Sequence, residues 1–298
     1  MRWLVGIDLK NSGAGAVEFA RWLRARAPTD TFTGAHVIDF DVRDLFARVQ
    51  DGAVDDGAPP YVDELLAPLR ADPTFAEVGS ITASSAEDGL VHVAQSKGDD
   101  VILIGRRKPV NEGAVFRLGR VARRLLRTLP APVVVVPPDA RRADFLDGPV
   151  LLATDMGENS DGAARFAVTV AEGLQMDTLV TSVASVPDEL SLLTVHERWR
   201  AVVDETFEST RTRLAQWVQA HKLADARTSV VEGHIGPALL EVAKVASASM
   251  IVVGSRGLST FDRIMLSSVG TELAASAPIP VAVVPPEWPS STSASEPQ

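Results

Sequence analysis

The chain has 298 residues, 46% of them hydrophobic and 23% charged, a composition typical of globular proteins and a length typical of two domains. Its formal net charge of −10 argues against general nucleic-acid binding, and the absence of cysteine excludes disulfides, thiolate metal sites and a cysteine nucleophile. No stretch approaches the about 18 apolar residues that span a membrane, and the first apolar run is too short for a signal peptide, so we expect a cytoplasmic protein.

The first predicted elements occur twice in the chain. An apolar run, an aspartate and a helical pattern follow one another at Trp3–Leu23 and again at Val150–Val170, which places Asp8 and Asp155 147 residues apart. Two later pairs repeat in the same order at spacings of 149 and 148 residues, namely Gly105 with Gly254 and Pro132 with Pro280. Because three matches share nearly one spacing, we predict two copies of one globular fold. The predicted domains are residues 1–140 and 148–286, followed by a disordered tail at 287–298.

Short apolar runs alternate with helical patterns in each copy. The second copy has five predicted strands, at Val150–Thr154, Thr178–Val183, Thr228–Glu232, Met250–Val253 and Pro280–Val284. The predicted helices are one capped by Ser160 or Asp161, one or two within Leu190–His221, and one with Pro237 in its first turn. Strands of continuous apolar residues between helices indicate a parallel sheet covered on both faces, which is an α/β fold.

The fourth predicted strand of the second copy ends in a glycine-rich turn. Gly254 and Gly257 follow the apolar run, and Ser267 and Ser268 follow after nine more residues. In such sheets ligands bind beyond the carboxyl ends of the strands, where glycine permits a positive φ and backbone N–H groups at a helix start bind phosphate. The simpler interpretation is an ordinary turn and a helix cap. A P-loop lysine motif and a G-x-G-x-x-G after the first strand are both absent from the sequence.

Three segments of the second copy resemble the universal stress protein family. They are the strand ending at Asp155, the segment EGHIGPALLEVAKVASASMIVVGSRG and the segment APIPVAVVPP, and the duplication resembles the tandem two-domain members. The resemblance covers nearly the whole chain apart from the tail and Leu190–His221. It implies two tandem doubly wound domains, similar to adenine-nucleotide hydrolases, each with a five-stranded parallel sheet.

The resemblance also implies a nucleotide site in the second copy. Nucleotide-binding members carry G-x2-G-x9-G-[S/T], which the chain matches except that Ser267 replaces the third glycine. The implied ligand is ATP or a related adenine nucleotide, with or without Mg²⁺. Asp155 would face the adenosine and Val183 would line the base pocket, although Asp155 is equally a residue type that stabilises turns. The implied binding residues are Asp155, Val183, Val253, Gly254, Ser255, Arg256, Gly257, Ser267, Ser268 and Val269.

The first copy departs further from this motif. Lys108 stands where the second glycine is expected, the interval to Gly119 is one residue longer, and Arg120 replaces the serine. We therefore expect one ATP for each chain, or none. The segment Arg106–Arg127 holds eight basic residues and one acidic residue, Glu112. This basic cluster is interpreted either as a solvated helix face or as a site for an anion or acidic partner.

The sequence contains no pattern typical of a catalytic site. The five histidines, at 36, 92, 196, 221 and 234, form no H-E-x-x-H motif, and no G-x-S-x-G elbow occurs, so we predict no catalytic residue and no metal ligand. The favoured hypothesis is a nucleotide-binding stress or regulatory protein with at most slow, incidental ATP hydrolysis. The alternatives are a stress adaptor that acts through protein–protein contacts without nucleotide, and an enzyme of the related adenine-nucleotide hydrolase fold.

The last strand of each copy, in PVVVVPP and PVAVVPP, is short and apolar. An exposed edge of this kind promotes unwanted pairing, so we expect it to be covered. In the family this strand makes the dimer contact, and the two copies are expected to pair through it. We further expect a homodimer of the tandem chain, because closed two-fold dimers are the commonest assembly. Membranes and nucleic acids are not expected partners.

Overall fold

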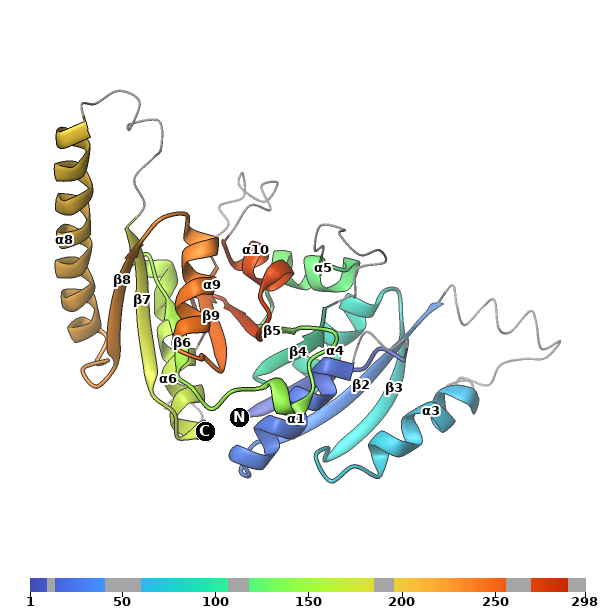
Figure 1. Cartoon of the computed structure of the whole chain (residues 1–298). Helices are drawn as coiled ribbons and strands as arrows, with labels where there is room; N and C mark the ends of the chain where they lie inside the picture. Colours follow the sequence, from blue (N-terminus) through green and yellow to red (C-terminus); the bar gives the residue numbers. More distant parts are fainter. Residues whose placement is uncertain (10–13, 41–59, 107–117, 185–195, 256–268, 289–298) are drawn as a thin grey trace, which may run out of the picture. The chain divides into compact units, whose positions relative to one another are not determined.

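The computed structural model describes residues 1–9, 14–40, 60–106, 118–184, 196–255 and 269–288. These residues form two compact units in which strands and helices alternate (Figure 1). The first unit comprises Met1–Phe145 and Ala274–Pro280, and the second comprises Leu146–Leu273 and Val281–Gln298. Among the described residues, the helices are all too short or too polar to cross a membrane.

The first unit contains a five-stranded parallel sheet in the order β3-β2-β1-β4-β5. Its strands are β1 (Arg2–Gly6), β2 (Thr31–Asp39), β3 (Glu77–Ala83), β4 (Val101–Gly105) and β5 (Val133–Val136). Its helices are α1 (Ala14–Arg26), α3 (Pro60–Arg70), α4 (Ala86–Lys97), α5 (Arg120–Thr128) and the short 3-10 turn η1 (Arg142–Asp144).

The second unit repeats this arrangement in the order β10-β9-β6-β7-β8. Its strands are β6 (Val150–Ala153), β7 (Thr178–Ala184), β8 (Arg227–Glu232), β9 (Met250–Gly254) and β10 (Val281–Val284). Its helices are the 3-10 turn η2 (Glu158–Ser160), α6 (Asp161–Leu174), α8 (His196–Ala220), α9 (Ile235–Val245) and α10 (Val269–Ser276), except that the last three residues of α10, from Ala274, belong to the first unit. The predicted α/β fold with a five-stranded parallel sheet in each copy is confirmed.

The strand register of the two sheets reproduces the sequence repeat. In the first unit Trp3 pairs with Val101, and in the second Val150 pairs with Met250. The central strands are therefore related by 147 residues and their neighbours by 149, the two spacings found in the sequence. Equivalent residues of the two copies thus occupy equivalent positions in the two sheets.

The predicted strands of the second copy lie within two residues of the observed ones at each end. Pro237 is the third residue of α9, and its fixed φ favours this place in the first turn of a helix. The helical stretch predicted over Leu190–His221 contains one continuous helix, α8, while residues 190–195 lie outside the described part. The strands are buried because helices cover both faces, and all four residues in each of β5, β6 and β10 are buried.

The helices of the second unit divide between the two faces of its sheet. Crossovers between parallel strands are right-handed, so α6 and α8 cover one face, and α9 and α10 the other. Consistent with this, His221 at the end of α8 contacts Asp161 of α6. On the other face, Gly236 of α9 approaches the side chain of Glu272 of α10.

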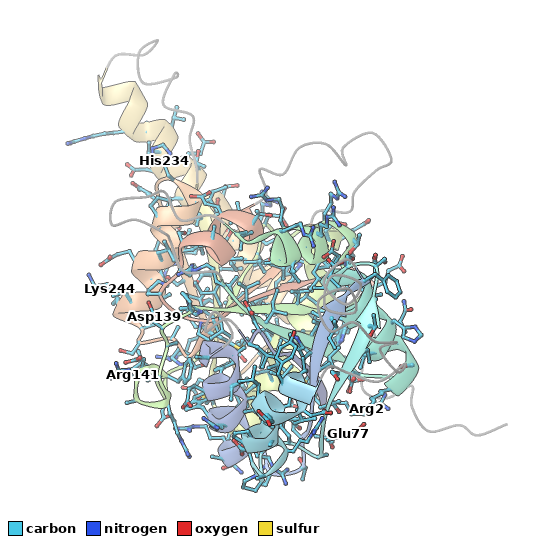
Figure 2. All side chains as sticks on the ribbon, turned by 90° about the vertical axis from the view of Figure 1, so that its right-hand side faces the viewer. Arg2, Glu77, Asp139, Arg141, His234 and Lys244 are labelled. Atoms are coloured by element: carbon cyan, nitrogen blue, oxygen red, sulfur yellow. The ribbon has the colours of Figure 1, made fainter. Side chains whose placement is uncertain are left out.

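Most charged side chains of the described residues lie on the outside of each unit, and the buried exceptions are Glu87 and Arg106. Arg2 and Glu77 are exposed in the first unit, and His234 and Lys244 in the second (Figure 2). The exposed surface of the described residues is therefore mixed in charge, in contrast to the apolar strands beneath it.

Candidate functional site

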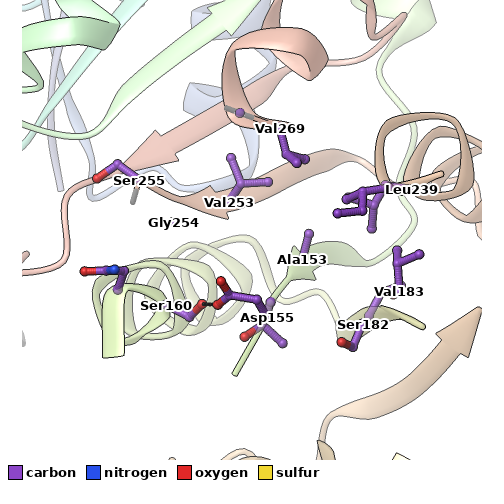
Figure 3. Close-up of a pocket in the computed structure, with 15 residues that line it drawn as sticks. Ala153, Asp155, Ser160, Ser182, Val183, Leu239, Val253, Gly254, Ser255 and Val269 are labelled. Atoms are coloured by element: carbon purple, nitrogen blue, oxygen red, sulfur yellow. Dashed lines mark hydrogen bonds between the residues drawn. The ribbon is translucent and has the colours of Figure 1, made fainter. Parts of the chain in front are cut away.

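A cavity in the second unit lies beyond the carboxyl ends of β6, β7 and β9 (Figure 3). The chain leaves β6 toward β7 on one side and returns to β9 on the other, so the cavity is at the point where the strand order reverses. Ligands of doubly wound sheets bind at this point. The cavity volume is about 120 Å³, whereas one water needs about 10–15 Å³, so a larger ligand group fits.

The cavity brings together residues that are far apart in the sequence. Six predicted binding residues line it: Asp155, Val183, Val253, Gly254, Ser255 and Val269. The other four, Arg256, Gly257, Ser267 and Ser268, lie outside the described residues. The part of the predicted site that the structure describes is therefore assembled in one place.

Asp155 stabilises the loop that follows β6 and also faces the cavity. Its Oδ1 accepts hydrogen bonds from the backbone N of Gly157 and from the hydroxyl of Ser160, both at 3.0 Å. The side chain of Thr154 accepts a bond from the N of Met156 at 2.8 Å, which holds Met156 at a positive φ of 63°. Asp155 Oδ2 accepts no hydrogen bond from the described residues. Asp155 can therefore stabilise the turn and also contact a ligand, because the turn uses Oδ1 and leaves Oδ2 for the ligand.

The prediction that Ser160 or Asp161 caps α6 is correct in position but not in the expected hydrogen bond. Ser160 occupies the N-cap position, but its hydroxyl donates to Asp155 and makes no cap hydrogen bond. The physical reason is the turn η2, which leads directly into α6 and gives Ser160 helical angles of φ −86° and ψ −11°. A capping side chain requires extended backbone at this position. Ser160 therefore orients Asp155.

The sequence suggested that Gly254 permits a positive φ, but the structure shows that the absence of its side chain is what matters. Gly254 is the last residue of β9 and is not among the described residues with positive φ. A Cβ at Gly254 would lie 2.5 Å from the carbonyl oxygen of Asn159. The absence of a side chain thus lets the η2 backbone pack against the end of β9, at the wall of the cavity.

The cavity combines an apolar wall with a few polar groups. Val183, Leu239 and Val253 contribute apolar side chains, and Asp155 is the charged side chain among the described lining residues. At the end near β9, Val269 and Gly270 begin α10, whose first N–H groups have no partner within the helix. An apolar slot beside a helix start suits a ligand with a flat ring and an anionic group.

Several lining residues were not predicted from the sequence. Ile235 and Leu239, four residues apart on α9, form part of the apolar wall. Their spacing of four residues places them on one face of the helix, and this spacing could have predicted an apolar wall from the sequence. Thr181 and Ser182 of β7 also line the cavity, but they precede Val183 without any distinguishing pattern.

A comparison with models of known protein families shows which family the chain belongs to. The model of the universal stress protein family matches residues 1–137 and, separately, residues 148–285. The chain belongs to this family. It carries two copies of the family's domain in tandem, as the sequence repeat predicted.

Curated relatives include universal stress proteins of mycobacteria. One from Mycolicibacterium smegmatis is 30% identical over 191 residues, which cover 64% of this chain and 63% of the relative. Universal stress protein Rv2623 of Mycobacterium tuberculosis is 26% identical over 272 residues, covering 89% of this chain and 82% of the relative. The chain thus spans less than two thirds of the M. smegmatis relative and most of the M. tuberculosis one.

Solved structures of low sequence identity share the fold over nearly the full length. A functionally unknown protein, PA1789 of Pseudomonas aeruginosa, has a TM-score of 0.66 at 18% identity and covers 96% of this chain and 93% of its own. A universal stress protein of Archaeoglobus fulgidus has a TM-score of 0.60 at 16% identity and covers 96% and 98%. These likenesses establish the architecture of the tandem chain.

The basic cluster of the first unit is only partly solvated. Arg124 of α5 forms an ion pair with Glu87, whose side chain is 7% exposed. Arg120 lies 3.7 Å from Asp39, and Arg123 donates to the carbonyl of Leu118. The interpretation of this cluster as a wholly solvated face is therefore wrong for Arg124, because its guanidinium neutralises a buried carboxylate.

Arg106, at the end of β4, is buried in the first unit. Its Nη1 donates to the carbonyl oxygens of Ala274 at 3.3 Å and Ala277 at 3.1 Å, which belong to the same unit. Burial lowers the pKa of Arg106 from its ordinary value. The equivalent position in the second unit is Ser255, which lines the cavity, so the two copies use this position differently.

Proposed function

We propose that the protein binds ATP or a related adenine nucleotide in the cavity of its second unit and acts in a stress response or its regulation. The observation that carries the proposal is the cavity itself, in which Asp155, Val183, Val253 and Gly254 meet at the strand-order reversal. Six of the ten residues that the family resemblance selected from the sequence line this cavity, which supports the proposal. Membership of the universal stress protein family supports the same assignment.

The geometry suggests an orientation for the nucleotide. The base would lie against the apolar side chains of Val183 and Leu239, near β7 and α9. Oδ2 of Asp155 is available to accept a hydrogen bond from a ribose hydroxyl, since Oδ1 is already used twice. The phosphates would lie toward Ser255 and the start of α10, because the positive end of a helix dipole favours an anion.

Binding is proposed to be unequal between the two copies. Lys108 and Arg120 stand at motif positions of the first copy, and its loop is one residue longer. Phosphate held by backbone amides tolerates little displacement, because hydrogen bonds weaken steeply with poor geometry. Losing one or two charge-assisted bonds, each about 1.5–3 kcal/mol, lowers affinity by roughly one to four orders of magnitude. We expect one ATP for each chain, with any hydrolysis slow and incidental.

Titration calorimetry with ATP, with and without Mg²⁺, tests this proposal on the full chain. One site is expected in the wild type and in Lys108→Ala. In Gly257→Val the site is expected to be lost, because a β-branched side chain blocks the turn that holds phosphate. At about 100 times the dissociation constant, ATP should stabilise the second unit by about 2.7 kcal/mol.

Two results would contradict the assignment. Two equal sites would show that the first copy binds as well as the second. Binding that survives Gly257→Val but is lost in Lys108→Ala would place the nucleotide in the first copy. If no nucleotide binds at millimolar ATP, the protein–protein adaptor becomes the better function. The expected homodimer, the pairing of the two last strands and the cytoplasmic location stay predictions.

A further inference from the structure

Thr181 of β7 lines the cavity and carries a buried hydroxyl. The residue is fully inaccessible, with 0% of its surface exposed, and it lines the cavity. Its Oγ1 has no hydrogen-bond partner among the described residues, although its backbone oxygen accepts a bond from Thr154 N at 3.0 Å. A buried hydroxyl without a partner costs free energy, so its retention calls for an explanation.

The strand register places the Thr181 side chain on the face that holds the cavity. Ala153 of β6 pairs with Thr181 on one side and with Val253 on the other, and residues paired across parallel strands point to the same face. Val253 faces α10, since its Cγ2 lies 3.1 Å from where a Cβ at Gly270 would be. Thr181 therefore points to the face covered by α9 and α10.

Thr181 lies deeper in the cavity than the predicted base contact. Val183 is two residues nearer the end of β7 and shares the same face, while Ser182 points to the opposite one (Figure 3). Two neighbours of Thr181 on this face, Ala153 and Val183, line the cavity and carry no polar side-chain atoms, whereas Ser229 of β8 carries a hydroxyl but is not a lining residue. The inner end of the cavity is thus apolar apart from one hydroxyl.

We propose that Thr181 determines specificity by hydrogen bonding to a polar edge atom of the ligand's ring. This inference rests on the proposed nucleotide binding and adds a residue to it. A hydroxyl both donates and accepts, so it recognises a ring nitrogen or an exocyclic group of a heterocyclic base and disfavours an apolar ring. The base then enters with its polar edge toward β7, and the phosphates remain at the β9 and α10 end of the cavity.

The test compares Thr181→Val, Thr181→Ser and Ser229→Ala in the full chain, with ATP as the probe. Valine keeps the shape of threonine and removes the hydroxyl, whereas serine keeps the hydroxyl. Ser229 is a matched control, since it pairs with Thr181 in β8 but is not among the cavity-lining residues. The readouts are ATP affinity by calorimetry and the melting temperature of the ligand-free protein.

Thr181→Val is expected to change the two readouts in opposite directions. ATP affinity should fall about five- to a hundredfold, because the ligand's polar edge then meets a methyl group. The ligand-free melting temperature should stay equal or rise, because an unpartnered buried hydroxyl is removed. Thr181→Ser and Ser229→Ala should bind ATP within about threefold of the wild type, a difference of about 0.7 kcal/mol or less.

The outcomes separate this inference from the proposed function. Wild-type binding that Thr181→Val leaves unchanged would overturn the role of Thr181 and leave the nucleotide site intact. A Thr181→Val protein that melts markedly lower or does not fold would show that the hydroxyl is structural, which also overturns the role. No binding of ATP to the wild type would overturn the proposed function and, with it, this inference.

Discussion

The backbone of Asn159 packs so closely on Gly254 that a Cβ at position 254 would lie 2.5 Å from the Asn159 carbonyl oxygen. Both residues line the cavity of the second unit. A side chain at Gly254 therefore forces β9 and the η2 turn apart. We expect Gly254→Ala to destabilise the second unit by about 1–3 kcal/mol, as overpacking of a fixed backbone does. Urea unfolding measures the loss, and nucleotide affinity should fall with it.

The matched control is Gly173→Ala in α6. A Cβ at Gly173 meets nothing within 4 Å, and the residue is exposed on a helix. Alanine favours helix over glycine by about 1 kcal/mol, so this variant should be neutral or more stable. Equal stability of the two alanine variants would show that the η2 turn moves aside freely and that Gly254 is not required.

Much of the fold follows from the sequence because its signals are local. Runs such as Val150–Ala153 are continuously apolar and are interrupted by helical patterns, which predicts buried parallel strands. The duplication adds a second copy of the same pattern, and its spacing agrees with the register of Val150 and Met250. The strand order was not predicted, because periodicity alone does not determine which strands are neighbours.

The candidate site was less predictable because its contacts are tertiary. Asp155 and Val183 were selected by resemblance, and the fold places both at the cavity. The bond from Ser160 to Asp155 was missed, because a serine before a helix normally indicates a cap. The unpartnered hydroxyl of Thr181 has no sequence signal at all, since whether a polar group is satisfied depends on neighbours brought by other strands.

His221 connects the end of α8 to the first turn of α6. Its Nδ1 lies 2.8 Å from the carbonyl oxygen of Trp217, and its Nε2 lies 2.9 Å from Oδ1 of Asp161. The imidazole also stacks on the Trp217 ring, with centroids 4.1 Å apart. His221→Ala removes these contacts and should destabilise the second unit by about 1–2 kcal/mol.

Urea unfolding monitored by tryptophan fluorescence checks this prediction. His92, which is exposed on α4 of the first unit, provides the control, and His92→Ala should leave stability within about 0.5 kcal/mol. The contact is unimportant if His221→Ala unfolds at the same urea concentration as His92→Ala.

Arg124 neutralises a carboxylate that the fold has taken from water. Glu87 of α4 is 7% exposed, and its ion pair with Arg124 joins α4 to α5. Removing one partner of such a pair leaves a buried charge uncompensated, so Arg124→Ala should cost about 1–3 kcal/mol. Arg127→Ala, on the same helix and exposed, should change stability by less than about 0.5 kcal/mol.

A double variant distinguishes the ion pair from a general effect of charge on α5. Glu87→Gln in the Arg124→Ala background removes the uncompensated charge and should recover part of the lost stability. Guanidinium chloride masks charge effects, so urea is the appropriate denaturant. Equal losses in the two single arginine variants would mean that the cluster acts as an undifferentiated basic surface.

Asp99, in the turn after α4, is expected to lower stability at neutral pH. Burial raises the pKa of its carboxyl, and Asp100 and Glu77 raise it further, while Arg2 and Lys97 act in the opposite direction. Its Oδ2 is buried and has no hydrogen-bond partner among the described residues. The folded state thus favours the protonated carboxyl, whereas the unfolded chain ionises near pH 3.9.

The sign of the pH dependence follows from this difference. Between the unfolded pKa and the higher folded pKa, the folded protein binds more protons than the unfolded chain, so stability falls as pH rises through that window. Above the folded pKa the penalty is constant. Asp99→Asn removes the ionisable group, so the variant should be more stable than the wild type at pH 7. Its advantage should shrink as pH falls toward 4, in urea titrations at several pH values.

Asp225→Asn, at an exposed aspartate of the second unit, should show no such pH-dependent gain. A gain at Asp99 that does not change with pH would show that the effect comes from the shape of the side chain rather than from its ionisation.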